Sequence, residues 1–411
     1  MSISRRSSAP PRRRVQSFGS LIGCVLLLVM GAGLVPTTHA ARATRPDRQP
    51  HIDPLLSEAL DRVLDQTVAG KHVPGVALAV TLPGYQTWQG ARGVADRQTK
   101  ISLLPTDNVR VASVTKMFVA TVVLQLVEEG WLALDVPIAT WLPAAVPSAP
   151  TLTTRHLLNH TSGLYDYLDR PFLRAVQREP ERIWTPQALL AYAMQHRLLF
   201  PPGARGRWAY SNTNYVLLGM LVEQVTERTL AHEIRWRILD PVGLTHTFFA
   251  PDDVMHGTLV HGYAGTKDLT HFNMSYTWAS GNIASTVDDL GRFVHALFGG
   301  HLLQRSTLDS MYSWVDTRGA LGLPYLEYGL GVMRYRLSVG RDPQGQRRPV
   351  EAVSVLGHIG NLGGYRSAVW YLPASGITIA IAMNQGTANP IPVATRVLDA
   401  ILTYQDRNLA P

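Results

Sequence analysis

The pair of residues best suited to nucleophilic chemistry is a serine followed three positions later by a lysine, Ser113 and Lys116. A serine hydroxyl is a weak nucleophile until a neighbouring base removes its proton. A helix that begins at Ser113 would carry the Lys116 amine one turn later on the same face, close to the hydroxyl. Lysine can act as that base when its surroundings lower its pKa, whereas arginine keeps its proton. The alternative is a helix-capping serine beside a solvated lysine.

Two further patterns supply polar groups that such a reaction could use. In Tyr210-Ser211-Asn212, a tyrosinate between two cations could relay a proton, and the asparagine amide could hold a substrate carbonyl. In His358-Ile359-Gly360, the histidine could supply positive charge or a hydrogen bond opposite Tyr210, and the glycine would let a substrate backbone approach a strand. Taken singly, the first pattern also fits a turn, and the second a hydrogen-bonded histidine beside a glycine turn.

These residues need a scaffold, and strand patterns near both ends of the chain flank a mainly helical middle. The four expected strands are residues 73–82, 86–94, 367–372 and 377–383. The first two are separated by Pro83-Gly84 and the last two by Pro373–Gly376, so each pair indicates a hairpin. Helices are expected from Pro54, with Asp53 as its cap, and at about 392–404. This order predicts a helical subdomain, roughly residues 113–300, inserted into a domain that contains a sheet.

Composition excludes several classes of protein. Of the 411 residues, 46% are hydrophobic and 17% are charged, which is ample for a large core and unlike a disordered chain. The formal charge of +8 comes from 38 basic and 30 acidic residues. Five arginines lie in the first 40 residues, which contain no acid, so the rest of the chain carries only +3. We therefore expect no nucleic-acid partner.

The N-terminus has the pattern of an export signal. An Arg-rich stretch over 1–14 precedes an apolar run over 21–35 and the small-residue site Thr38-His39-Ala40. We predict a signal peptide over 1–40, a linker over 41–52 and a catalytic domain over 53–405, with an uncleaved anchor as the alternative. The single cysteine, Cys24, would leave with the signal, so the mature chain could form no disulfide. A periplasmic or secreted enzyme is therefore expected.

The combination of the three patterns is more informative than any one of them. Their order resembles that of the serine β-lactamase and penicillin-binding DD-peptidase family, with its S-x-x-K, Y-x-N and K/H-x-G motifs. The resemblance covers about residues 53–405, and the stretch His156–Leu164 and the run Tyr210–Tyr215 support it. The nearest branch looks like the soluble D-alanyl-D-alanine carboxypeptidases, alongside class C β-lactamases and related esterases. The implied fold is α/β (α+β) and DD-peptidase/β-lactamase-like: an antiparallel sheet flanked by helices, with an inserted all-helical subdomain.

The resemblance also implies roles for the catalytic residues. Ser113 would be acylated by the substrate, Lys116 and Tyr210 would share the proton transfers, and His358 would polarise the pocket. The oxyanion would lie between the backbone N–H groups of Ser113 and Asn361. Substrate binding would fall to Asn212, Gly360 and Asn361. The resemblance implies no cofactor and no metal.

The chain departs from the carboxypeptidase branch where that branch anchors a terminal carboxylate. The third motif there commonly reads His-Thr-Gly-Thr, and here Ile359 and Asn361 replace the two threonines. The arginine expected after a Gly-Leu-Gly stretch is replaced by Met333, with Arg334 one residue later. A shift of one residue on a strand turns the side chain to the other face. Arg334 or Arg366 would have to compensate, so a strict carboxypeptidase is in doubt.

We therefore expect an exported serine hydrolase that acts on D-amino-acid peptides or amides. Its candidate partners are small-molecule or peptide substrates, including peptidoglycan fragments and β-lactams. A β-lactamase, a carboxylesterase or transesterase of the same fold, and a non-catalytic penicillin-binding sensor are the alternatives. A metallohydrolase using His156 and His160 is disfavoured, because no Glu follows the first histidine to complete His-Glu-x-x-His.

Overall fold

In the computed structural model the chain divides into two units, residues 1–48 and residues 49–411. The structure describes residues 49–408 except 71, 147–148, 338 and 341–352. The predicted signal peptide and most of the predicted linker lie outside the described residues. Among the helices that the structure does describe, none is both long enough and apolar enough to cross a membrane.

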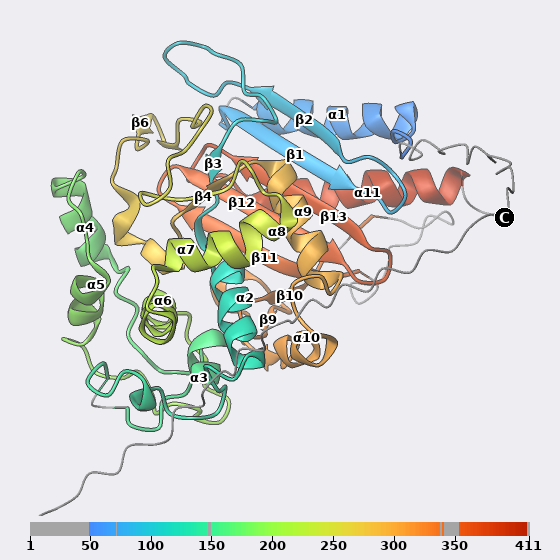
Figure 1. The fold of residues 1–411 in the computed structure, drawn as a ribbon. Coiled ribbons are helices and arrows are strands. Elements are labelled where there is room, and N and C mark those ends of the chain that lie inside the picture. The colour runs from blue at the N-terminus through green and yellow to red at the C-terminus, as the bar shows by residue number, and fades with distance from the viewer. Residues whose placement is uncertain (1–48, 71, 147–148, 338, 341–352, 409–411) are drawn as a thin grey trace, which may run out of the picture. The chain divides into compact units, whose positions relative to one another are not determined.

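An eight-stranded antiparallel sheet forms the centre of the described unit (Figure 1). Its strand order is β2-β1-β13-β12-β11-β10-β9-β8. The strands are β1 Gly75–Thr81, β2 Trp88–Gly93, β8 Val315–Asp316, β9 Glu327–Tyr328, β10 Met333–Arg336, β11 Ser354–Leu362, β12 Tyr365–Leu372 and β13 Ile377–Met383. Both predicted hairpins are therefore present, and β1 pairs with β13 to join the two ends of the chain in one sheet.

Helices cover both faces of the sheet, and large and small side chains alternate along its central strands. On β1, Val76, Leu78 and Val80 pack into the core beneath helices α1 (Pro54–Ala69) and α11 (Pro390–Asn408). The intervening Ala77 and Ala79 belong to the other core, with helix α9 (Val287–Phe298). Large residues thus fill the space under two helices, while alanines let α9 approach the sheet closely.

The segment between the two parts of the sheet is mainly helical. It contains α2 Thr115–Glu128, α3 Thr154–Leu158, α4 Arg170–Arg178, α5 Pro186–Ala193, α6 Asn212–Thr226, α7 Leu230–Ile234 and α8 Asp240–Val242. Thr or Asp side chains cap several helix starts, for example Thr153, Asp169 and Thr185. The segment also contributes short strands: β3 Val109–Arg110, β4 Phe248–Phe249 and β7 Ile283–Ser285 form a second sheet, and β5 Tyr263–Ala264 pairs with β6 Lys267–Asp268. Helix α10 (Arg305–Met311) follows this segment.

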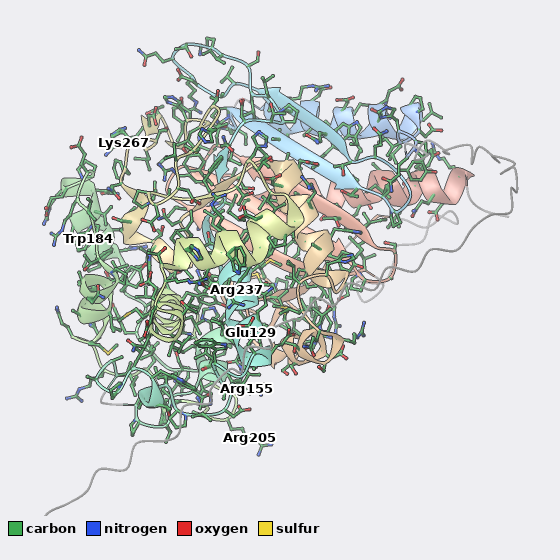
Figure 2. The ribbon with its side chains drawn as sticks, in the orientation of Figure 1. Glu129, Arg155, Trp184, Arg205, Arg237 and Lys267 are labelled. Atoms are coloured by element: carbon green, nitrogen blue, oxygen red, sulfur yellow. The ribbon has the colours of Figure 1, made fainter. Side chains whose placement is uncertain are left out.

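Helix α2 is central to this arrangement, since most of its residues are buried. Its C-terminal end is fixed by Glu129, which accepts two hydrogen bonds from Arg237 at 2.5 and 3.0 Å. Arg237 also donates to the buried Glu233 at 2.5 Å, and Figure 2 shows Glu129 and Arg237 near one another below α7 and α8. Such a network of charges resists displacement of the helix. The N-terminal residues of α2, where a reactive group would lie, are held by their own burial in the core.

Candidate active site

Ser113 lies on a short 3₁₀ turn, Ala112–Val114, that leads into α2. The residue before it, Ala112, has a φ of +52°, which is unfavourable for a residue with a Cβ atom. Such a conformation costs roughly 1–2 kcal/mol and persists only where packing enforces it. The packing is provided by β12, where the Ser367 hydroxyl donates to the Val111 carbonyl at 2.7 Å. The fold therefore holds the serine in a strained turn.

Strand β11 passes directly against this turn, and Gly360 makes the close approach possible. A Cβ atom at Gly360 would lie 2.2 Å from the Val111 carbonyl oxygen and 3.1 Å from the Ala112 Cβ. A backbone oxygen cannot move aside as the end of a side chain can. Gly360 does not line the cavity beside Ser113. The backbone that lies against Gly360 is the chain's own turn at Val111 and Ala112 and not a substrate. Its predicted contact with substrate stays a prediction.

The Lys116 amine is fully buried and makes three polar contacts. Its Nζ lies 3.2 Å from the Ser113 Oγ and donates to the Asn212 Oδ1 and the Ser280 carbonyl oxygen, each at 2.7 Å. Burial lowers the Lys116 pKa to about 7, against a smaller opposing effect of the Asp166 carboxylate. A neutral amine has two N–H donors, which the two carbonyl oxygens can accept, and one lone pair, which can face the serine hydroxyl. This is the arrangement that a base requires.

Tyr210 completes the group around the nucleophile, but as a neutral phenol. Its ring lies 4.9 Å from the Lys116 Nζ, and Tyr210 lines the cavity beside Ser113. Burial raises the pKa of Tyr210 well above 10, although the nearby Ser113 hydroxyl opposes this. The buried His160 ring stacks on Tyr210 with 4.3 Å between the ring centroids. Burial lowers the pKa of His160, so this ring is neutral. A tyrosinate between two cations, as considered from the sequence, is not what these surroundings favour.

His358 is also neutral, and its hydrogen bonds differ from those expected. It is fully buried on β11, and burial lowers its pKa to about 3. Its Nδ1 lies 2.6 Å from the Ile359 carbonyl oxygen and therefore carries the proton, and its Nε2 accepts from the Tyr328 hydroxyl at 2.9 Å. His358 lines the cavity beside Ser113 but supplies no positive charge there. Its expected partner, Tyr210, is replaced by Tyr328.

The side-chain amide of Asn212 is held at one end by Lys116 and at the other by Asp166, a carboxylate that the sequence interpretation missed. The Asn212 Nδ2 lies 3.2 and 3.1 Å from the two Asp166 oxygens, while its Oδ1 accepts from Lys116. Asp166 also accepts from the backbone N–H groups of Asn212 and Leu168. The Asn212 Oδ1 thus orients the Lys116 amine, while the Asn212 Nδ2 donates to Asp166. Binding of a substrate amide by Asn212 stays a prediction.

Two groups of this site had no signal in the sequence. Asp166 lies 46 residues before Asn212 and belongs to no catalytic pattern, so only the fold brings them together. Ser280 contributes a backbone carbonyl, which any residue possesses. It follows Trp278, whose φ of +33° marks another constrained turn.

A cavity of about 500 Å³ opens above Ser113, between helix α4, the segment 264–276 and strand β11. It brings together the predicted residues Ser113, Tyr210, Asn212, His358 and Asn361. Its other lining residues are mostly apolar: Leu168, Leu173, Val176, Gln177, Ala264, Leu269, Phe272, Met274, Tyr276, Leu321, Met333, Ile359, Leu362 and Gly363. Within the part of the chain that the structure describes, no Asp, Glu, Lys or Arg lines it.

The two arginines considered as carboxylate anchors are engaged elsewhere. Met333 lines the cavity, whereas Arg334 pairs with Glu327 at 2.6 Å and packs over the Trp314 ring. Arg366 donates to the Ala388 carbonyl oxygen at 3.0 Å and does not line the cavity. The one-residue shift inferred from the sequence therefore leaves an apolar side chain at the expected arginine position.

The alternative metal site would need His156 and His160 on one face of a helix, and the chain does not adopt that geometry. Helix α3 ends at Leu158, so His156 and His160 do not share a helical face. His160 has a φ of +62°, and its Nδ1 accepts from the Ser211 backbone N–H. The His156 Nδ1 accepts from the Thr153 N–H within a capping box. These ring nitrogens serve local structure.

Comparison with known proteins gives a consistent result. The Beta-lactamase family model matches residues 60–403. A D-stereospecific amidohydrolase from Streptomyces sp. is 32% identical, with a TM-score of 0.70, and the match covers 84% of this chain and 98% of that one. A D-amino acid amidase from Ochrobactrum anthropi SV3 is 28% identical with a TM-score of 0.74, over 85% and 99% of the two chains. These neighbours confirm the predicted fold class.

The matches to curated sequences are more partial. Esterase EstB of Burkholderia gladioli is 33% identical over 204 residues, which are 46% of this chain and 50% of the esterase. The matches span 50–62% of the length of several such relatives.

Proposed function

The chain belongs to the Beta-lactamase family of serine hydrolases, and from this premise we propose that it works through an acyl-enzyme formed on Ser113. The observation that carries the proposal is the Lys116 amine, which is buried beside two carbonyl acceptors and 3.2 Å from the Ser113 hydroxyl. With its pKa lowered to about 7, this amine is substantially unprotonated at neutral pH.

In the acylation step, Lys116 accepts the Ser113 proton as the Oγ attacks the substrate carbonyl. The bond from Oγ to the carbonyl carbon forms, and the negative charge moves to the carbonyl oxygen. The backbone N–H groups of Ser113 and Asn361 are the proposed donors to that oxygen, and one such donor is typically worth about 2.7–4 kcal/mol. The bond to the leaving group then breaks, and the proton returns from Lys116 to the departing nitrogen or oxygen. We propose that the Tyr210 hydroxyl carries it, and the support is the Tyr210 ring 4.9 Å from the Lys116 Nζ in the cavity beside Ser113.

In deacylation, water replaces the leaving group and the same residues act in the reverse order. Lys116 accepts a proton from water as it attacks the acyl carbon, and Ser113 recovers a proton when its ester bond breaks. His358 would act through Tyr328 as a neutral acceptor rather than as a cation.

We propose D-amino-acid peptides or amides as the acyl donors. The support is similarity over nearly the whole length of a D-stereospecific amidohydrolase and a D-amino acid amidase. An esterase is the second candidate, favoured by the similarity to EstB and by a cavity whose described lining residues include no Asp, Glu, Lys or Arg. We propose that the enzyme acts after export, on the evidence of the signal pattern over residues 1–40.

An acylation screen tests this proposal. Wild-type protein would be mixed in turn with a penicillin, a D-Ala-D-Ala peptide, N-acetyl-D-phenylalaninamide and a p-nitrophenyl ester. Intact mass would detect the adduct and product assays would detect turnover. We expect an adduct of the acyl mass with steady product from the amide or the ester. Acylation without steady product would instead favour a sensor, and the absence of any adduct or product would contradict the proposal.

A further inference from the structure

Among the residues that the structure describes, the lining of the cavity above Ser113 offers neither an acidic nor a basic side chain. An ammonium or a carboxylate that leaves water needs an opposite charge or several hydrogen bonds to offset its desolvation. Among the described lining residues, the polar side chains are Ser113, Gln177, Tyr210, Asn212, Tyr276, His358 and Asn361, and none of these carries a formal charge. A charged donor would therefore lose solvation without a compensating ion pair.

Charged groups behind the lining do not change this conclusion. The Lys116 amine, 3.2 Å from the Ser113 Oγ, gives an ammonium no opposite charge. Asp166 is half-buried, does not line the cavity, and already accepts hydrogen bonds from Leu168 and Asn212. Lys267 lies 5.7 Å from the Phe272 ring, on the outer side of the lining, and Figure 2 shows it at the edge of the molecule near β6. As a cation it gives an ammonium no partner.

The apolar part of the lining comes from several elements that face one another. Leu173 and Val176 of α4 lie on one side. Leu269 and Phe272 come from the segment before α9, and Met333 comes from β10. A hydrophobic substituent would exchange water for contacts with these side chains, and this gain grows with the apolar area that is buried.

We infer that the site selects acyl donors that carry no formal charge near the scissile bond and that present a hydrophobic group. N-blocked hydrophobic D-amino-acid amides and simple hydrophobic esters fit this description, whereas amides with a free α-ammonium do not. This inference rests on the proposed function, because it describes the substrate class of the same Ser113 site.

A matched pair of substrates tests the charge requirement. N-acetyl-D-phenylalaninamide and D-phenylalaninamide would be compared at pH 6.5, where an α-amine with a pKa of about 7.7–8 is mostly protonated. Because both are assayed at one pH, the fraction of free enzyme with a neutral Lys116 is the same for both. We expect kcat/KM to be at least tenfold higher for the N-acetyl compound. Equal values, or a preference for the cationic amide, would overturn the inference.

A charge introduced into the lining provides a second readout. Gln177 is an exposed residue of α4 that lines the cavity, so Gln177→Glu adds a carboxylate with little change in shape. We expect this variant to reduce the preference for the N-acetyl compound at least threefold. Gln195→Glu, the same substitution at an exposed residue outside the lining, should leave the preference unchanged. A Gln177→Glu preference equal to that of wild type would contradict the inference.

A series of p-nitrophenyl esters tests the hydrophobic requirement. From acetate to butyrate to hexanoate, kcat/KM should rise by about threefold to fourfold per added methylene until the cavity is filled. A flat or falling series would count against the inference.

The Ser113→Ala variant distinguishes failure of the proposed function from failure of the inference about substrate charge. If no donor shows turnover that depends on Ser113, the proposed function fails and the inference falls with it. If turnover depends on Ser113 but charged donors are preferred, only the inference fails.

Discussion

At the scale of single residues, the chemistry depends on how Lys116 is surrounded. The residue is fully buried, and two of its neighbours are carbonyl oxygens that accept hydrogen bonds from either charge state of the amine. Burial therefore decides the balance and lowers its pKa to about 7, while Asp166 raises it through its negative charge. The Asn212 amide lies between the carboxylate and the amine and fixes the position of both.

Replacement of Lys116 by arginine tests whether the site needs a base or only a positive charge. Lys116→Arg should lower kcat/KM by about a hundredfold or more, because a guanidinium keeps its proton and is larger than an amine. Steady-state kinetics with the best ester or amide would measure the loss. Lys100→Arg, on the exposed surface, is the matched control and should behave like wild type. An active Lys116→Arg enzyme would mean that charge alone suffices.

Removal of the Asp166 charge should shift the pH dependence. Wild-type kcat/KM should rise with pH as Lys116 loses its proton near pH 7. Since the carboxylate raises the Lys116 pKa, Asp166→Asn should move this acidic limb to lower pH, in addition to any loss of rate from misplacing Asn212. The pH profile of kcat/KM for the two proteins would measure the shift. A limb displaced to higher pH would contradict the assigned electrostatics.

At the scale of elements, the site depends on strand β11 pressing against the turn before α2. The sequence patterns predicted both hairpins, the first helix and the location of Ser113 near a helix start, because alternation and capping are local signals. They could not predict that Ala112 adopts a left-handed conformation or that Gly360 faces Val111. Both features result from contact between segments about 250 residues apart, and no local pattern encodes such contacts.

Two glycine substitutions test the close approach of β11. Gly360→Ala would place a Cβ 2.2 Å from the Val111 carbonyl oxygen, so we expect a loss of stability of about 1–3 kcal/mol. A decrease in kcat/KM of at least tenfold should accompany it, because the Ser113 turn must move. Gly291→Ala in α9 is the control: its nearest neighbours lie 3.8 and 3.9 Å away, and helix propensity should stabilise the protein by about 0.5–1 kcal/mol. Urea unfolding and kinetics of both variants would check this, and a harmless Gly360→Ala would contradict the packing argument.

At the scale of the whole described unit, the cavity exists because the inserted helical segment faces the sheet across the nucleophile. The three motifs and their order were sufficient to predict the family and the residues that gather at Ser113. The protonation states were not predictable, because they depend on how distant parts of the chain bury Lys116 and His358 completely and Tyr210 in part. Asp166 was missed for the same reason. Charge selection in the cavity is likewise a property of the assembled molecule.

The absence of a carboxylate anchor among the described lining residues predicts weak discrimination at the C-terminus of a peptide. A hydrogen-bonded anchor to a charged group is worth about 1.5–3 kcal/mol, or roughly one to two powers of ten. We expect kcat/KM for a D-Ala-D-Ala peptide to change by less than about tenfold when its terminal carboxylate is converted to an amide. Release of the last residue from the two peptides would be measured. A hundredfold preference for the free acid would require an anchor, with Arg334 or Arg366 released from its present partner.

The central claim is that the acyl group passes through Ser113, and peptide mapping of the trapped adduct tests it most directly. Wild type, Ser113→Ala and the surface control Ser306→Ala would each be mixed with a p-nitrophenyl ester, quenched with acid within the first turnover and digested. We predict one acyl group on the peptide containing Ser113 in wild type and in Ser306→Ala, and neither an adduct nor turnover in Ser113→Ala. Covalent acylation of Ser113→Ala, or undiminished product release by it, would contradict the account.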